Sequence, residues 1–190
     1  MKQIIVNRIK DSIEAKTTLL NNIELIDNVD KLAGEIVKCI REDHKLVLCG
    51  NGGSASDALH FAGEIVGRFK KERSAWPAVV LNSDVATLTA IANDYGYEDV
   101  FARQVEGHVR NDDVFIGIST SGNSENVFRA AKVAKEQGAI CAALLGNDGG
   151  KIKDIVDYPI VVPCNSTARI QEIHILLIHV ICEIIEELLV

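Results

Sequence analysis

The sequence has no apolar segment as long as the roughly 18 uninterrupted residues expected of a membrane-spanning helix. Its opening stretch, MKQIIVNRIKDSIEAK, carries charges at helical spacing and lacks the apolar core of a secretory signal peptide. No stretch rich in glycine, serine or proline marks a linker between domains. We therefore expect a single domain over residues 1–190, large enough for a substantial core and without a membrane partner.

Positive charge is also in short supply, because 20 Lys and Arg residues face 27 Asp and Glu residues, which gives a net charge of −7 at pH 7. This balance argues against a nucleic acid as the main partner, since phosphate backbones bind basic surfaces. It does not exclude a small anionic ligand, because a local group of backbone N–H donors can bind a phosphate inside an acidic protein.

The cysteines are few and form no CxxC pair, which argues against a disulfide framework or a zinc ribbon. Their number is five, and most of them lie in apolar runs, which is typical of buried free thiols. They are Cys39, Cys49, Cys141, Cys164 and Cys182. Free thiols predict a reducing compartment, and so a cytoplasmic protein.

What the sequence does contain is an alternation of short apolar strands and amphipathic helices. Strands are expected at residues 45–50, 77–82, 112–120, 139–148 and 158–164. Helices are expected as a pair over 2–43, then at 54–69, 83–94, 97–109 and 121–138, with a short one near 149–157 and a long one from 167 to the end. This order predicts an α/β fold: a three-layer, doubly wound and mainly parallel sheet covered on both faces. Residues 1–43 form an N-terminal helical segment, and 44–190 form the α/β core with the C-terminal helix.

The stretch ISTSGNSENV, at the end of the predicted third strand, offers four hydroxyl groups ahead of a helix N-terminus: Ser119, Thr120, Ser121 and Ser124. Backbone N–H groups and the helix dipole favour an anion at such a place. The turn is neither a P-loop nor a GxGxxG motif. Helix capping alone would need only one or two of these side chains, so we interpret the turn as a phosphate site.

A second turn, GNGGSAS, follows the first strand and contains Asn51, Gly52, Gly53 and Ser54. Taken alone, it is equally consistent with a tight turn and with close approach to a ligand. The helix after it carries His60 and Glu64, which share a face at i, i+4 spacing. A histidine and a carboxylate beside a glycine turn favour chemistry on a phosphorylated small molecule.

The last helix, which is otherwise mostly apolar, carries Gln171, His174 and His179. Gln171 and His179 lie about 12 Å apart along the axis. Either their side chains lean together into one site, or two copies of the chain supply them. His174 is on a neighbouring row and is interpreted as a packed, hydrogen-bonded residue. Asn93 and Asp94 follow an apolar helix and fit either an Asx turn or a pair of contacts to sugar hydroxyls.

At this point the sequence resembles the sugar isomerase (SIS) domain family, and within it the phosphoheptose isomerases. The resemblance rests on CGNGGSASDALHFAGEIVGRF, AIANDYGYEDVFARQV, GISTSGNSENV and TARIQEIHILLIH, in matching order and spacing along the whole chain. One position departs from the family pattern, because Ala168 stands where some relatives carry an aspartate.

The resemblance implies a site residue by residue. Substrate contacts would fall on Asn51, Gly52, Gly53, Ser54, Glu64, Asn93, Asp94, Ser119, Thr120, Ser121, Ser124 and Gln171. Acid–base catalysis would fall on Glu64 and His179. One zinc ion per subunit would be held by His60, Glu64, Gln171 and His179.

The implied reaction is the ketose–aldose isomerisation of D-sedoheptulose 7-phosphate to D-glycero-D-manno-heptose 7-phosphate through an enediolate. It would be the first step of ADP- or GDP-heptose synthesis for bacterial surface glycans, catalysed with zinc or by Glu64 and His179 alone. The alternatives are a non-catalytic SIS protein, such as a regulator of replication initiation, and a sensor or isomerase of another sugar phosphate. Retention of Glu64 and His179 favours the enzyme.

The resemblance also implies a homotetramer with active sites between subunits. The apolar residues of the last helix, from Ile173 to Val190, exceed what one face on the sheet can bury. Together with the N-terminal helices they predict an interface between copies of the chain.

Overall fold

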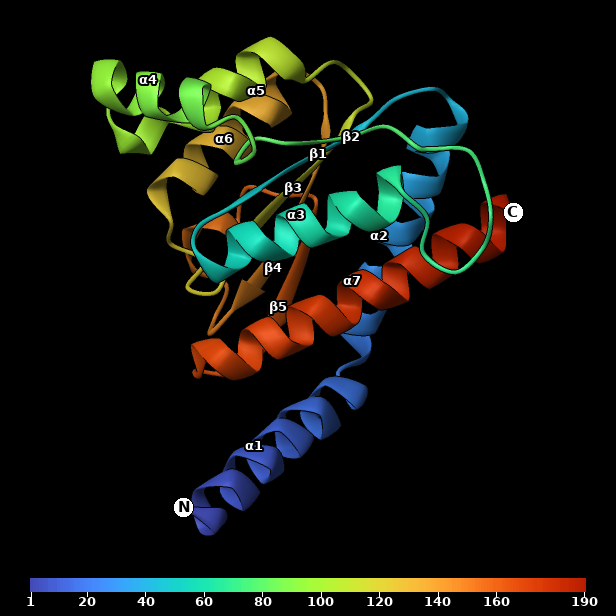
Figure 1. Cartoon of the computed structure of the whole chain (residues 1–190), viewed down its shortest axis with the longest axis vertical. Helices are drawn as coiled ribbons and strands as arrows, with labels where there is room; N and C mark the ends of the chain where they lie inside the picture. The colour runs from blue at the N-terminus through green and yellow to red at the C-terminus, as the bar shows by residue number, and fades with distance from the viewer.

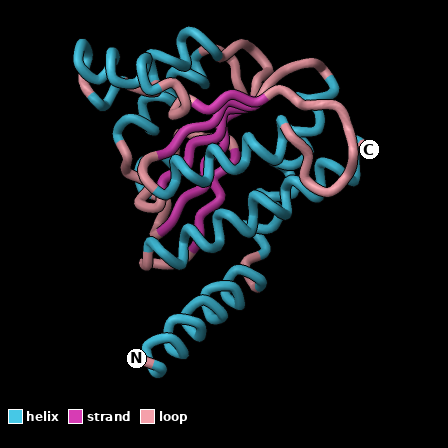
Figure 2. Tube along the Cα trace, viewed as in Figure 1, coloured by secondary structure: helices cyan, strands magenta, loops and turns pink.

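A single parallel sheet of five strands forms the centre of the protein in the computed structural model, which describes all 190 residues (Figures 1 and 2). Its strand order is β2-β1-β3-β4-β5, and every neighbouring pair runs parallel. The strands are β1 (Leu46–Gly50), β2 (Ala78–Val80), β3 (Val114–Ser119), β4 (Ile140–Gly146) and β5 (Tyr158–Val162). The chain order reverses between β1 and β3, so the predicted doubly wound sheet is confirmed.

Helices cover both faces of this sheet. The elements of one side are α2 (Ile23–Arg41), α3 (Gly53–Val66) and α7 (Thr167–Leu189). Those of the other side are α4 (Val85–Tyr95), α5 (Ala102–His108) and α6 (Glu125–Glu136), with short 3₁₀ turns η1 (Tyr97–Asp99) and η2 (Gly150–Ile152). Along β1, Leu46 and Leu48 face the first layer whereas Val47 and Cys49 face the second, and all four are buried. Apolar side chains on both faces explain why these strands read as continuous apolar runs.

Helix α1 (Lys2–Leu20) projects from the body of the molecule (Figure 1). Leu19, near its end, is its one buried residue, whereas Ile4, Ile5, Val6, Ile9 and Ile13 are exposed. Helix α7, by contrast, is covered by α1, α2 and α3, so that its exposed large hydrophobic residues are Leu176 and Leu188. The exposed apolar surface therefore lies more on α1 than on α7, whereas the sequence predicts it mainly on the last helix.

One predicted helix differs in the structure. Residues 97–109, expected as one helix, form the 3₁₀ turn η1 and the separate helix α5. Gly96 precedes η1 with φ of 102°, a conformation that glycine adopts without strain, and it redirects the chain after α4. Val100 and Phe101, between η1 and α5, are completely buried. Tertiary packing of these two side chains thus decides the break.

All five cysteines are free thiols, as predicted, and only Cys164 is not fully buried. Burial raises the pKa of the Cys141 thiol to about 12. No helix of the structure combines the length and the apolar character that crossing a membrane requires.

Candidate active site

The stretch ISTSGNSENV at residues 118–127, the serine turn, connects β3 to α6 at the carboxyl edge of the sheet. The Oγ atoms of Ser119 and Ser124 lie 2.8 Å apart, so the two hydroxyls face one another across the turn. Ser124 is the N-cap of α6, yet its side chain makes no capping hydrogen bond. Several backbone N–H groups also lack an acceptor within the chain: those of Ser121, Ser124, Glu125 and Asn126. The turn therefore gathers unused donors at a helix N-terminus, as an anion site requires.

The shape of this turn depends on glycine. Gly122 has φ of 67°, and a Cβ atom there would overlap the Gly149 carbonyl of the next loop. The cationic side chains near the turn, Lys151 and Arg129, both form ion pairs with the Glu125 carboxylate. The hydrogen bond from Lys151, followed by that from Arg129, lowers the pKa of Glu125. Binding of an anion would thus rely on neutral donors.

The stretch GNGGSAS at residues 50–56, the glycine turn, follows the neighbouring strand β1 and lies beside the serine turn. Gly52 has φ of 57° and precedes α3. A Cβ atom at Gly53 would collide with the side-chain carboxamide of Gln171, which shows that α7 packs directly on the start of α3. Asn51 exchanges side-chain hydrogen bonds with Asn126 of the serine turn, so the two turns are joined.

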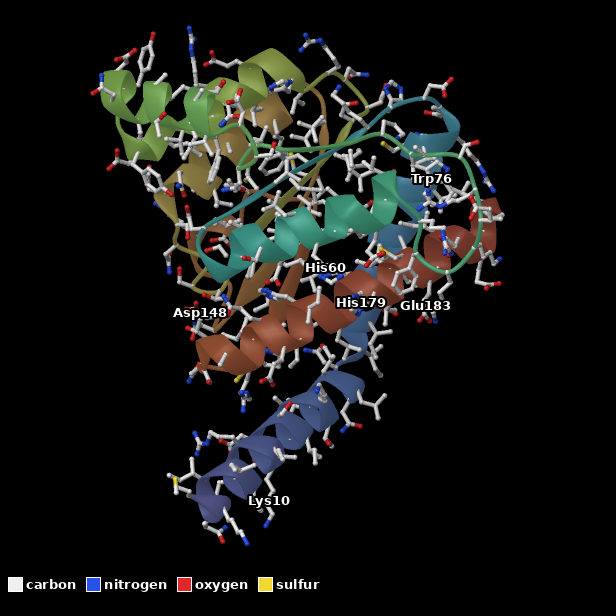
Figure 3. All side chains as sticks on the ribbon, viewed as in Figure 1. Lys10, His60, Trp76, Asp148, His179 and Glu183 are labelled. Atoms are coloured by element: carbon white, nitrogen blue, oxygen red, sulfur yellow. The ribbon has the colours of Figure 1, made fainter.

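His60, Glu64 and His179 form a cluster between α3 and α7, where His60 and His179 point toward one another (Figure 3). The His60 Nε2 atom lies 3.0 Å from Glu64 Oε1 and 3.2 Å from His179 Nε2. The Phe69 ring stacks on the His179 ring with a centroid distance of 5.6 Å. The cluster is open to solvent, since the His60 side chain is 45 % exposed.

The donor set of this cluster fits a metal ion. Its three ligand atoms, two imidazole nitrogens and a carboxylate oxygen, all lie within 4.8 Å of one another. Ligands of a tetrahedral zinc ion, each about 2.0–2.1 Å from the metal, are separated by about 3.3 Å. The observed spacings of 3.0 and 3.2 Å are close to that geometry. Nitrogen and oxygen donors of these types suit zinc.

Helices α3 and α7 run side by side in the same direction (Figure 1). Gln171 meets Gly53, and His179 meets His60. Gly53 and His60 are about 10 Å apart along α3. Within one chain, Gln171 therefore lies at the glycine turn while His179 lies in the His–Glu–His cluster.

Asn93, Asp94 and His174, also singled out in the sequence, lie outside the His–Glu–His cluster and the two turns. Asn93 and Asp94 are exposed at the end of α4, where the Asn93 Nδ2 group donates to Asp94 Oδ1 at 2.8 Å. No hydrogen bond joins them to the two turns within the chain. His174 is completely buried, and its Nε2 atom lies 3.0 Å from the Leu145 carbonyl oxygen. The interpretation of His174 as a packed, hydrogen-bonded residue is confirmed.

The structure adds residues that the sequence did not single out. Asn126 and Tyr97 both contact the Asn51 side chain, with the Tyr97 hydroxyl donating to Asn51 Oδ1 at 3.0 Å. Glu186 and Arg73 form a buried ion pair beyond the His–Glu–His cluster. No local pattern marks these residues, because each partner is far away in the sequence.

The fold is that of a sugar isomerase, or SIS, domain, and a family model described as "SIS domain" matches residues 13–146. The chain is 49 % identical over 187 residues to a phosphoheptose isomerase of Sulfurimonas denitrificans, covering 98 % of this chain and 96 % of the relative. It is 57 % identical over 151 residues to one from Nitratiruptor sp., covering 80 % and 81 %. The solved phosphoheptose isomerase of Neisseria gonorrhoeae superposes with a TM-score of 0.92 at 43 % identity, covering 98 % of both chains. The chain therefore belongs to the phosphoheptose isomerase family of SIS-domain proteins.

Proposed function

We propose that this protein interconverts D-sedoheptulose 7-phosphate and D-glycero-D-manno-heptose 7-phosphate. The observation that carries the proposal is the His60–Glu64–His179 cluster, whose His60 and Glu64 lie on the helix that begins at the glycine turn. Its relatives in both sequence and structure are phosphoheptose isomerases. The aldose phosphate would supply heptose for nucleotide-activated precursors of bacterial surface glycans, in the cytoplasm.

Binding starts at the two turns in this proposal. The unused hydroxyl and N–H donors of the serine turn hold the phosphate, with Ser119, Thr120, Ser121 and Ser124 as its side chains. The glycine turn, with Asn51, Gly52, Gly53 and Ser54, holds the sugar oxygens next to Gln171. Asn93 and Asp94, at the end of α4, are proposed as further contacts to sugar hydroxyls.

The chemistry requires a base that removes the proton from C1 of the ketose and returns a proton to C2. Glu64 is assigned as that base, and His179 as the group that moves protons at the carbonyl and hydroxyl oxygens. The hydrogen bond between Glu64 Oε1 and His60 orients the carboxylate. Phe69, stacked on His179, shields that imidazole from water on one side.

His60, Glu64 and His179 are proposed to hold a zinc ion, with Gln171 as a fourth ligand remaining a prediction. When bound, zinc supplies a Lewis acid that polarises the substrate carbonyl. Incubating the purified protein with sedoheptulose 7-phosphate, with and without added zinc, tests the function. Failure to form the aldose in both conditions would contradict it.

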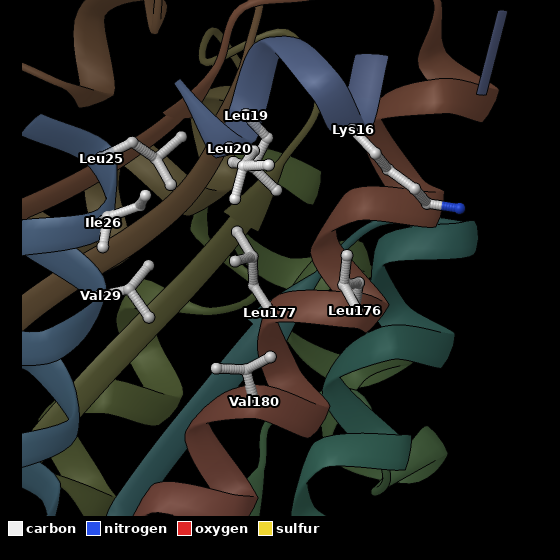
Figure 4. Close-up of a pocket in the computed structure, with 9 residues that line it drawn as sticks. All are labelled: Lys16, Leu19, Leu20, Leu25, Ile26, Val29, Leu176, Leu177 and Val180. Atoms are coloured by element: carbon white, nitrogen blue, oxygen red, sulfur yellow. The ribbon is translucent and has the colours of Figure 1, made fainter. Parts of the chain in front are cut away.

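A homotetramer is proposed as the working assembly. The exposed apolar residues of α1 supply one surface. A groove of about 400 Å³ between α1, α2 and α7 supplies another (Figure 4). It is lined by Lys16, Leu19, Leu20, Leu25, Ile26, Val29, Leu176, Leu177 and Val180. Covering both surfaces requires further copies of the chain, most simply as a dimer of dimers.

A further inference from the structure

The loop after α3, residues 67–76, is tied to α7 by one buried carboxylate. Glu186 is only 2 % exposed. It accepts hydrogen bonds from the backbone N–H groups of Phe69 at 3.0 Å, Lys70 at 2.8 Å and Lys71 at 2.9 Å. Arg73 completes the set, with its Nε atom 3.2 Å from Glu186 Oε1. A charge so deeply buried needs this full set of partners to be stable.

The electrostatics agree with a permanently charged carboxylate. Burial by itself would raise the pKa of Glu186, but the three backbone N–H groups and Arg73 outweigh it and lower that pKa. Arg73 is equally buried, with a side chain only 4 % exposed. Both members of the pair are therefore removed from solvent, which distinguishes them from the exposed pairs around them.

Arg73 connects Glu186 to α3, the helix that carries His60 and Glu64. Its guanidinium donates to the backbone carbonyl of Glu64 at 2.7 Å and to that of Ile65 at 2.9 Å. These carbonyls belong to the last turn of α3, where cationic donors stabilise a helix C-terminus. The same guanidinium lies over the Trp76 ring, 3.5 Å from its centroid. Arg73 thus fixes the end of the helix that presents Glu64.

Phe69 connects Glu186 to His179 of α7. Its backbone N–H is held by Glu186, and its ring stacks on His179. Glu186 and His179 are seven residues apart on α7 and so lie on one face, two turns from each other. The carboxylate therefore controls where the loop places the Phe69 ring against the imidazole.

We infer that Glu186 is a positioning residue: through Arg73 and Phe69 it sets the relative placement of Glu64 on α3 and His179 on α7. This inference rests on the proposed roles of Glu64 and His179 in the isomerase and in metal binding. Glu186 touches no reacting atom. Replacing a residue that orients metal-binding side chains in this indirect way typically weakens metal affinity or activity about 10- to 100-fold.

The test compares Glu186→Gln with Glu187→Gln in the full chain. Glu187 is the matched control, because its exposed pair with Lys71 at 3.5 Å contributes little and the chemical change is identical. Zinc affinity is measured against a chromophoric chelator well below the unfolding temperature, and kcat and KM are measured with sedoheptulose 7-phosphate. Emission of Trp76, the single tryptophan, reports on the loop.

Glu186→Gln is expected to shift Trp76 emission, to weaken zinc binding about 10-fold or more and to lower kcat by a similar factor, with KM changed less than about twofold. Glu187→Gln should match the unmodified protein in all four measurements. A Glu186→Gln protein that shows the altered emission but keeps zinc affinity and kcat would overturn the inference, because the loop would then act on the fold alone.

A second variant decides the case if Glu186→Gln does not fold. Phe69→Leu removes the ring from His179 but leaves the backbone hydrogen bonds to Glu186 in place. It should weaken zinc binding and lower kcat while Trp76 emission stays unchanged, and unaltered values of both would refute the link through His179. Should the unmodified protein bind zinc but not isomerise the sugar, the proposed function fails while the zinc affinities still decide the role of Glu186.

Discussion

The side chains of Asn51 and Asn126 exchange two hydrogen bonds, of 2.8 and 3.0 Å, between the glycine turn and the serine turn. The Asn51 Oδ1 atom accepts a further bond from Tyr97, so its acceptor sites are filled and only one N–H of the carboxamide is left for a ligand. The pair therefore fixes both the spacing of the turns and the orientation of a predicted substrate contact.

Replacing Asn126 with alanine is expected to raise KM several-fold and to lower the free energy of unfolding by about 1–3 kcal/mol, because it removes two of the three side-chain hydrogen bonds of Asn51. Urea unfolding and steady-state kinetics measure the two effects. Tyr97→Phe is the milder comparison, since it removes one bond to the same oxygen. Equal kinetics in all three proteins would show that Asn51 does not orient substrate.

Glu64→Gln is expected to keep the fold and to bind the sugar phosphate, yet to lose turnover by about 10²-fold or more. The carboxamide has nearly the shape of the carboxylate but cannot accept the proton from carbon. Calorimetric binding of sedoheptulose 7-phosphate beside turnover separates the two properties. Turnover close to that of the unmodified protein would remove Glu64 from the mechanism.

Alanine at both Ser119 and Ser124 should raise KM with little change in kcat. The phosphate does not change its charge during isomerisation, so contacts to it stabilise the ground and transition states alike. Steady-state kinetics with circular dichroism as a check of folding provide the measurement. An unchanged KM would mean that the turn only begins α6.

Acid should destabilise the protein through His174. Burial lowers its pKa to about 4, with the hydrogen bond to Leu145 opposing that shift. Below the ordinary value of about 6.5 the unfolded chain takes up a proton that the folded chain refuses, so the free energy of unfolding falls as the pH falls. The loss between pH 6.5 and 4 is on the order of 3 kcal/mol.

Chemical denaturation across that pH range, on the unmodified protein and on His174→Gln, tests the assignment. The amide of glutamine keeps a donor for the Leu145 carbonyl but does not titrate. Its stability should therefore depend less steeply on pH over this range. Parallel curves for the two proteins would assign the acid sensitivity to other groups.

Assembly should depend on the exposed face of α1. Glutamate in place of Ile9, which is 56 % exposed, would place a charge in the proposed interface without disturbing the core. We expect dissociation together with loss of activity. Sedimentation over a dilution series, with activity measured on the same samples, tests both parts, and a fully active monomer would contradict the shared site. Lys10→Glu, a change at a residue already polar, is the control.

Secondary structure and layer order followed from local pattern. Apolar runs ending in glycine or serine predicted β1 and β3, because a strand buried on both faces must be apolar throughout. The break within 97–109 was missed because the burial of Val100 and Phe101 outweighs helical periodicity. Local spacing likewise gave His60 and Glu64 on one face of a helix, as the structure confirms.

The sequence by itself determined which chemical groups are present and which of them share a turn or a helix face, since those relations depend only on bonded geometry. Tertiary structure alone decided that His179 meets His60 across 119 residues and that Asn126 meets Asn51 across 75. It also decided that Glu186 lies under the loop from Phe69 to Arg73. These pairings arise from the parallel packing of α3 and α7 and from adjacent strand ends. The free energy of that packing is set by the whole core, and no short segment encodes it.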